Sequence, residues 1–218
     1  LVLPPIIILS YGSMMSAFPE MPGMSGSPET VGATAGTLFV AAFLPAVIGL
    51  FQVISARRAD ERLTLAGFPR EVLFLSRLLS VLVASLLTAI VSMSVLLVRV
   101  DVEAILSGGL VLVFVGVLYG CIGMLIGAIL PRELEGSLVL IFLVDMDEAL
   151  ASGVMQTDSD FTKLFPLHYP HDLFQASVEG SRIATTDFVL TLIYGVFVLV
   201  ATLIVYTEIA GTGGDRNG

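Results

Sequence analysis

Charged residues are scarce in this sequence. Only 13% of its 218 residues are Asp, Glu, Lys or Arg, 56% are hydrophobic, and the mean hydropathy is +0.98. A soluble domain of this size needs far more charge to cover its surface. The composition therefore excludes an ordinary soluble protein and predicts a membrane protein.

Lysine and cysteine are each present once. The net charge is −9 and Lys163 is the single lysine, which excludes a nucleic-acid-binding protein because phosphate binding needs clustered Lys and Arg. Cys121 has no second cysteine to pair with, so no intrachain disulfide can form. We read Cys121 as a small side chain packed among apolar residues.

Motifs for the common hydrolytic mechanisms are missing. The phosphate-binding loop needs a Gly-Lys pair, but the single lysine follows Thr162. There is no H-E-x-x-H pattern, and Gly-Met-Ser-Gly-Ser at 23–27 lacks the last glycine of G-x-S-x-G. We therefore expect no catalytic residues, no cofactor bound by this chain and no enzyme activity of its own. Only an intramembrane site built from scattered residues stays open.

Long apolar runs define the fold class. A helix needs about 20 apolar residues to cross about 30 Å of hydrocarbon. We predict an all-α polytopic membrane protein forming one transmembrane domain over residues 1–218. Because the chain opens on an apolar run without a basic flank, we expect its first span to be truncated at the N-terminus. The six expected spans are 1–17, 36–55, 72–98, 104–130, 137–154 and 188–209.

The distribution of basic residues predicts the orientation. With six alternating spans, seven arginines fall on one side: Arg57, Arg58, Arg62, Arg70, Arg77, Arg132 and Arg216. The other side keeps Arg99, Lys163 and Arg182. Because basic residues favour the cytoplasmic side, we expect the arginine-rich loop and the C-terminus in the cytoplasm of a cell-membrane protein.

The outer side then receives the longer segment 155–187. It contains both acidic and apolar residues, which predicts short amphipathic helices at the outer interface. His168 and His171 lie here, but a metal site needs three or four converging ligands, so we expect no metal. The acidic residues are Asp158, Asp160, Asp172, Glu179 and Asp187, and the apolar ones are Phe161, Leu164, Phe165, Leu173 and Phe174.

The segment 56–71 carries the strongest local signal. A charged helix with leucines at Leu63 and Leu65 is followed by Gly67 and Pro69, which break a helix. A second helix then enters the membrane through Arg77. An ordinary positive-inside loop would explain the arginines but not this helix–break–helix pattern. The pattern therefore favours a docking surface that projects from the bilayer.

This segment resembles the intracellular coupling loop in permease subunits of type-2 ATP-binding-cassette exporters. The turn at 131–136 is similar to the family's short cytoplasmic turn after span four, and the prolines and tyrosine at 166–170 are similar to its reentrant outer helices. The family's N-terminal interfacial helix is missing. The residues that carry the resemblance are Glu61, Arg62, Leu63, Leu65, Gly67, Pro69, Arg70 and Arg77.

The resemblance implies a function. Such a permease dimerises, as a homodimer or a heterodimer, and each copy docks a separate cytoplasmic ATPase that binds ATP and Mg. This chain would then couple ATP hydrolysis by its partner to substrate efflux. The implied coupling residues are Arg57, Arg58, Glu61, Arg62, Gly67, Pro69 and Arg70.

Three acidic residues lie within the fifth expected span. A carboxylate at the centre of a bilayer costs about 2.5–3.5 kcal/mol on insertion scales, so Asp145, Asp147 and Glu148 should avoid lipid. They either line a translocation path or gate, or they lie at the outer interface beyond a short span. A stand-alone carrier that uses these acids for protons or cations is the alternative function.

Glycines recur at a spacing of four in the fourth expected span. Gly116 and Gly120 form one pair, and Gly123 and Gly127 form another. This spacing lets helix backbones approach closely in lipid. We expect close packing within one subunit rather than a dimer contact.

Overall fold

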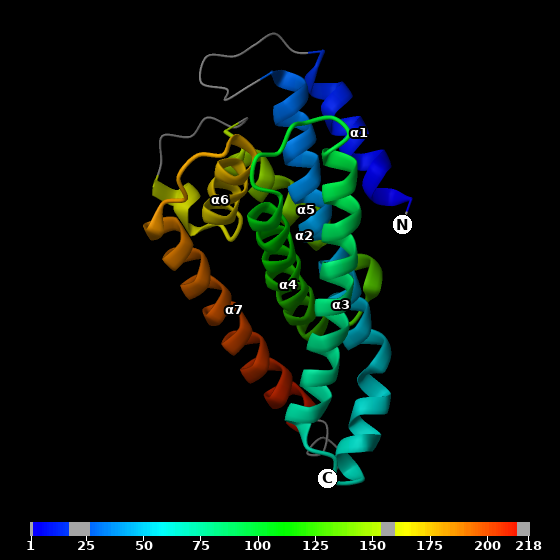
Figure 1. The fold of residues 1–218 in the computed structure, drawn as a ribbon. Helices are drawn as coiled ribbons and strands as arrows, with labels where there is room; N and C mark the ends of the chain where they lie inside the picture. Colours follow the sequence, from blue (N-terminus) through cyan, green and yellow to red (C-terminus); the bar gives the residue numbers. More distant parts are fainter. Residues whose placement is uncertain (1, 18–26, 154–159, 213–218) are drawn as a thin grey trace.

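The computed structural model describes residues 2–17, 27–153 and 160–212. Within these ranges the chain is helical and contains no strand (Figure 1). Asp158, expected on the outer side of the membrane, and Arg216, expected on the cytoplasmic side, are not among the described residues. The elements are α1 (Leu3–Met15), α2 (Pro28–Leu65), α3 (Arg70–Leu96), α4 (Ile105–Ile129), α5 (Glu133–Ala151), η1 (Asp160–Leu164), α6 (His168–Glu179) and α7 (Thr185–Thr212).

Four of the helices are long and apolar enough to cross a membrane: α2, α3, α4 and α7. These correspond to four of the six expected spans and are consistent with a multi-pass membrane protein. The other two expected spans differ. Helix α1 has 13 described residues, which is short for a crossing, and α5 carries five acidic residues in 19.

Helix α2 is much longer than its expected span of 36–55. It begins after Ser27, whose side chain accepts a hydrogen bond from the backbone N–H of Thr30, and Pro28 opens its first turn. It then runs for 38 residues, about 57 Å at a rise of about 1.5 Å per residue. Since the hydrocarbon of a bilayer is about 30 Å thick, α2 must extend beyond it.

The break predicted at Gly67 and Pro69 is confirmed. Gly67 adopts φ +91°, and its N–H donates to the carbonyl of Thr64. The N–H of Phe68 donates to the carbonyl of Leu63, which completes a Schellman ending. Helix α3 begins directly after Pro69. The charged segment before the break, however, is the end of α2 and not a separate short helix.

The central contact of the fold is the packing of α2 on α4. A Cβ placed on Gly123 would overlap the carbonyl of Ala46, and one on Gly49 would overlap the carbonyl of Gly120. A Cβ on Gly127 would lie 2.8 Å from the carbonyl oxygen of Leu50. The glycine spacing thus serves close packing within one chain, as the sequence predicted.

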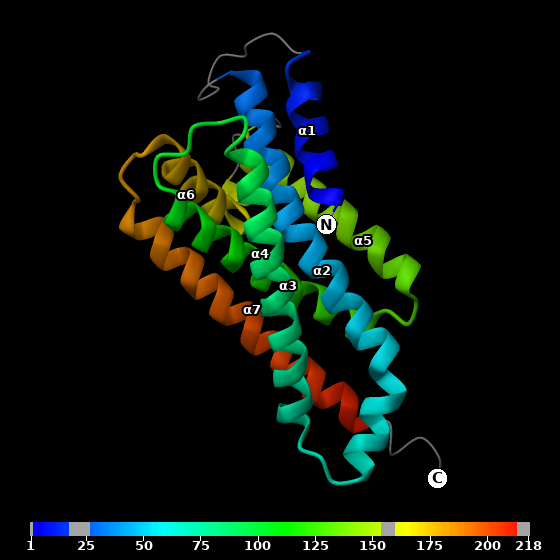
Figure 2. The ribbon, with the colours of Figure 1, turned by 45° about the vertical axis from the view of Figure 1, so that its right-hand side comes forward.

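The bundle has two distinct ends, one with the α2–α3 turn and the other with α6. Helices α4 and α7 both run toward the end of the bundle that carries the α2–α3 turn, where α7 also ends (Figures 1 and 2). Helix α6 lies at the opposite end and contacts α4, α5 and α7. Its buried face includes Pro170, Leu173 and Phe174. The segment 155–187 thus contains an amphipathic helix, α6, whose apolar face packs on the bundle.

Candidate functional site

The α2–α3 tip, which we define as residues 56–69, projects from one end of the bundle (Figure 2). Most of its side chains are exposed, including the apolar Leu65 at 86% and Phe68 at 52%. Arg58 and Arg62 are exposed as well. Exposed apolar side chains ringed by charge beyond the membrane-crossing part of a helix are typical of a protein-docking surface.

The tip stands on a polar base that joins three helices. Asp60 of α2 is buried, and its carboxylate accepts a hydrogen bond from Arg77 Nη2 at 2.8 Å and another from the Tyr206 hydroxyl at 2.7 Å. Arg70 Nη1 donates to the carbonyl of Thr207 at 3.0 Å. The base therefore connects α2 to α3 and to the last turns of α7.

The arginines of the tip, taken together with Arg70 directly after it, divide into two kinds. Arg57 Nη2 donates to the carbonyls of Gly127 and Ala128 at 3.1 Å each, at the C-terminal end of α4. There it satisfies carbonyls that have no partner within the helix. Arg57 and Arg70 thus hold the tip in place, whereas Arg58 and Arg62 remain exposed. The sequence grouped all four as coupling residues and could not separate them.

Asp60 is the residue that the sequence reasoning missed. Nothing within the segment 56–71 distinguishes Asp60 from the other charged residues there. The spacing around the turn does contain a signal for Asp60. When a tight turn joins two helices, two residues that are equally far from the turn in the sequence lie side by side. Asp60 and Arg77 are such a pair around residues 67–69. The third member, Tyr206, comes from a distant helix and gave no local signal.

The three acids of α5 lie at the end of the bundle opposite the tip, and each has a different environment. Asp147 is fully buried and accepts hydrogen bonds from the Tyr119 hydroxyl and from the backbone N–H of Leu167. It therefore ties α5 to α4 and to the segment before α6. We read Asp147 as a structural residue that satisfies two buried donors.

Glu148 and Asp145 face a cavity of about 320 Å³ between α1, α2 and α5. Glu148 is only 3% exposed, and neither of its carboxylate oxygens has a hydrogen-bond partner. Asp145 is exposed and accepts a hydrogen bond from the Tyr11 hydroxyl at 2.9 Å. The structure thus brings two of the three acids to one cavity and turns the third into the packed bundle.

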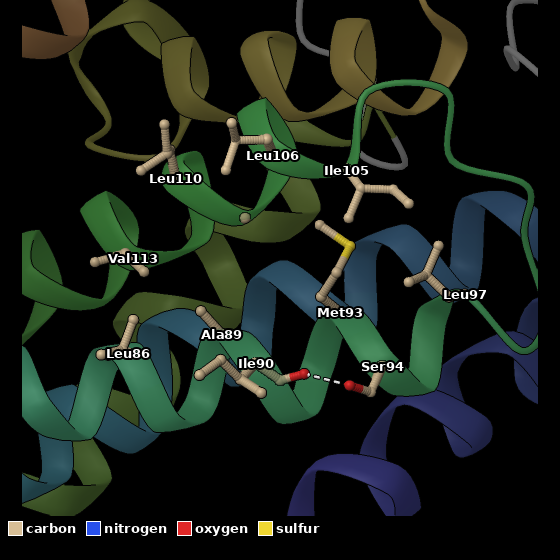
Figure 3. A pocket seen from close by; sticks show the side chains of 11 residues that line it. Leu86, Ala89, Ile90, Met93, Ser94, Leu97, Ile105, Leu106, Leu110 and Val113 are labelled. Atoms are coloured by element: carbon tan, nitrogen blue, oxygen red, sulfur yellow. Dashed lines mark hydrogen bonds between the residues drawn. The ribbon is translucent and has the colours of Figure 1, made fainter.

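A second cavity, of about 380 Å³, lies between α3 and α4 (Figure 3). Its walls are apolar, with Leu86 and Met93 on one side and Leu106 and Leu110 on the other. The Ser94 hydroxyl on its rim already donates to the carbonyl of Ile90 in its own helix. This groove offers no polar group to orient a ligand, as expected for a lipid-facing surface.

No protein-family model, curated protein or solved structure matches this chain. The resemblance to exporter permeases therefore depends on the sequence features of the tip, the turn at 131–136 and the segment 166–170.

Proposed function

We propose that this chain is the membrane-spanning permease subunit of an ATP-driven exporter, and that a separate cytoplasmic ATPase docks on the α2–α3 tip. One observation carries the proposal: the α2–α3 tip projects from the bundle and presents Leu65, Phe68 and two exposed arginines on a braced support. Charged and apolar groups on such a surface suit docking to a protein partner.

The braced base supports a role in coupling. Because Asp60, Arg77 and Tyr206 connect the tip to α3 and α7, a partner that moves the tip also moves these two helices. Rigid elements that move together can transmit such a change to a distant site. The ATPase would bind ATP and Mg, and the permease would act as a homodimer or a heterodimer.

The course of the chain supports six crossings. Helices α4 and α7 both run toward the tip, because the end of α4 binds Arg57 and the end of α7 binds Asp60. The chain must therefore return to the far end between them, and α5 is the helix available. Its 19 residues span about 28 Å, close to the hydrocarbon thickness. Together with α1, α2, α3, α4 and α7, helix α5 gives six membrane crossings in this proposal. In the same proposal, η1 and α6 correspond to the reentrant outer helices.

The orientation that we propose places the tip in the cytoplasm of a cell-membrane protein. The end of α2 carries Arg57, Arg58 and Arg62, and the start of α3 carries Arg70 and Arg77. These two helix ends and the end of α7 lie at the same end of the bundle (Figure 1). Arg99, which pairs with Glu29 at 2.8 Å, lies at the opposite end. The positive-inside rule then puts the C-terminus in the cytoplasm as well.

Charge reversal at the tip should abolish ATPase docking. We expect the Arg62→Glu variant of a C-terminally tagged chain to recover about tenfold less ATPase from gently solubilised membranes, because like charges across an interface repel. Leu65→Asp should act in the same direction by adding a buried charge to the interface. Mass spectrometry of the co-purified proteins measures both effects.

The matched control is Arg182→Glu, which reverses an exposed arginine at the other end of the bundle. It should recover ATPase at the native level. Arg70 is unsuitable for this test, because its side chain holds the end of α7 and its loss would also disturb the fold. Absence of any ATPase from the native chain, or equal recovery with Arg62→Glu, would contradict the proposal.

The alternative is a stand-alone carrier that uses the α5 acids for protons or cations. The Glu148 carboxylate favours it, since a buried carboxylate without a hydrogen-bond partner can bind a proton or a cation. Amide replacement of Asp145, Asp147 and Glu148 should then abolish pH-dependent transport in liposomes that contain this chain alone. An exporter permease, by contrast, should show no transport in liposomes without its ATPase.

A further inference from the structure

We infer that the cavity between α1, α2 and α5 binds a small organic cation with an apolar body. For the exporter proposed above, this would be the class of substrate. Binding itself needs no ATPase, so it can be tested on the purified chain, and its failure would be distinguishable from a failure of docking at the tip.

The first step of the inference is the state of Glu148. Its side chain is only 4% exposed, yet both carboxylate oxygens lack a hydrogen-bond donor. The nearest basic nitrogen, His171 Nε2, is 3.9 Å from Oε1, which is too far for a hydrogen bond. A buried carboxylate in this condition is costly unless a positive partner reaches it.

The second step is the location of that carboxylate. Glu148 lines the cavity together with Asp145, and among the described residues no basic side chain lines it. The hydroxyl of Tyr11 donates to Asp145 and holds its carboxylate at the wall. The cavity thus offers two carboxylates and no cation, so it is complementary to a positively charged group.

The third step is the shape and chemistry of the remaining wall. Among the described lining residues, apart from the two acids, Ser152 and the Tyr11 hydroxyl, the wall is carbon and sulfur from Met14, Met15 and small aliphatic residues. A volume of about 320 Å³ is far larger than a bare ion needs and lies at the lower end of the range for small-molecule sites. Methionine walls adapt to differently shaped apolar groups. An organic ammonium or pyridinium ion meets both requirements.

A metal ion does not fit the same residues. Over the part of the chain that the structure describes, no group of three His, Cys, Asp or Glu side chains is close enough to hold one. A proton would neutralise Glu148 but would leave the apolar volume without a function. The charge and the volume are explained together only by a cation that carries an apolar body.

The experiment is a fluorescence titration of the purified full chain in lipid nanodiscs with the dye dimethylaminostyryl-N-methylpyridinium. The unmethylated dimethylaminostyrylpyridine, measured at alkaline pH where it is neutral, serves as the uncharged analogue. We expect saturable binding of the cation and much weaker binding of the neutral analogue. Glu148→Gln should weaken cation binding by about tenfold or more, because a contact with a charged group is lost.

Two further variants keep the result interpretable. Glu133→Gln removes an exposed carboxylate at the other end of the same helix and should leave binding unchanged. Ala149→Leu narrows the cavity without touching a carboxylate and should weaken binding of the cation as well. Equal affinity of Glu148→Gln and the native chain, or equal affinity of the native chain for the two dyes, would overturn the inference.

Discussion

The Gly123→Ala variant is expected to unfold at a clearly lower temperature than the native chain. A methyl group at this position would overlap the carbonyl group of Ala46 in α2. Because the obstacle is backbone, no side chain can rotate away, and α2 and α4 must separate. Overpacking of a core typically costs about 1–3 kcal/mol, and we expect Gly123→Ala to reach the upper end of this range.

The chain provides its own probe for this measurement. It contains no tryptophan, but its single cysteine, Cys121, is buried in the same helix as Gly123. A maleimide that fluoresces after reaction with a thiol will therefore report the loss of α4 packing during a temperature ramp. Buried thiols react only when the fold opens, so the midpoint of the reaction follows unfolding.

Gly109→Ala is the matched control, on the same helix and with the same added methyl group. No heavy atom lies within 4 Å of the position that its Cβ would take. Alanine favours a helix interior over glycine by about 0.8–1.0 kcal/mol, so this variant should be unchanged or slightly stabilised. Gly127→Ala, whose nearest contact is 2.8 Å, should fall between the two. Equal midpoints for all three variants would contradict the packing described for α2 and α4.

The helices themselves could be predicted from the sequence because long apolar runs and breaker residues are local signals. The expected spans 72–98 and 104–130 differ by two residues or fewer from α3 and α4. The turn at Gly67 and Pro69 was also located correctly, since both residues act on the backbone at their own positions. The glycine pairs indicated close packing for the same reason.

The length of α2 could not be predicted in the same way. Hydropathy indicates where a helix leaves the hydrocarbon, but it does not indicate where the helix ends. The charged residues after Ser55 marked the membrane boundary, and the helix continues through them to Leu65 because nothing before Gly67 interrupts its hydrogen bonds. The charged part of the tip is therefore continuous with the long apolar helix α2. The sequence had instead predicted a separate coupling helix.

The roles of the individual charged residues could not be predicted from the sequence either. Asp145, Asp147 and Glu148 stand within four residues of one another, yet their contacts differ. Asp145 bonds Tyr11, Asp147 is satisfied by Tyr119 and Leu167, and Glu148 has no hydrogen-bond partner. Their surroundings come from α1, α4 and the segment before α6, which are distant in the sequence. Only the packing of these elements distinguishes a structural carboxylate from one that can bind a ligand.

Replacement of Asp60 by alanine is expected to have the other large effect on stability. Asp60 is buried and satisfies both the guanidinium of Arg77 and the hydroxyl of Tyr206. Its removal leaves the charge of Arg77 without its partner at a site where the arginine side chain is only 24% exposed. Breaking a buried ion pair in this way costs about 3–5 kcal/mol, and the partial exposure of Arg77 places the expected loss near the lower value.

The neighbouring Glu61→Ala is the control, since Glu61 is exposed and its loss should change the unfolding midpoint little. The double variant Asp60→Ala/Arg77→Ala should recover part of the loss, because it removes the unpaired charge together with its partner. Purely additive effects of the two single changes would contradict a direct interaction. Because Asp60 belongs to the base of the tip and not to its exposed surface, the folded fraction of Asp60→Ala should still recover the ATPase, whereas Arg62→Glu should not. The two variants therefore separate the stability of the tip from its recognition by a partner.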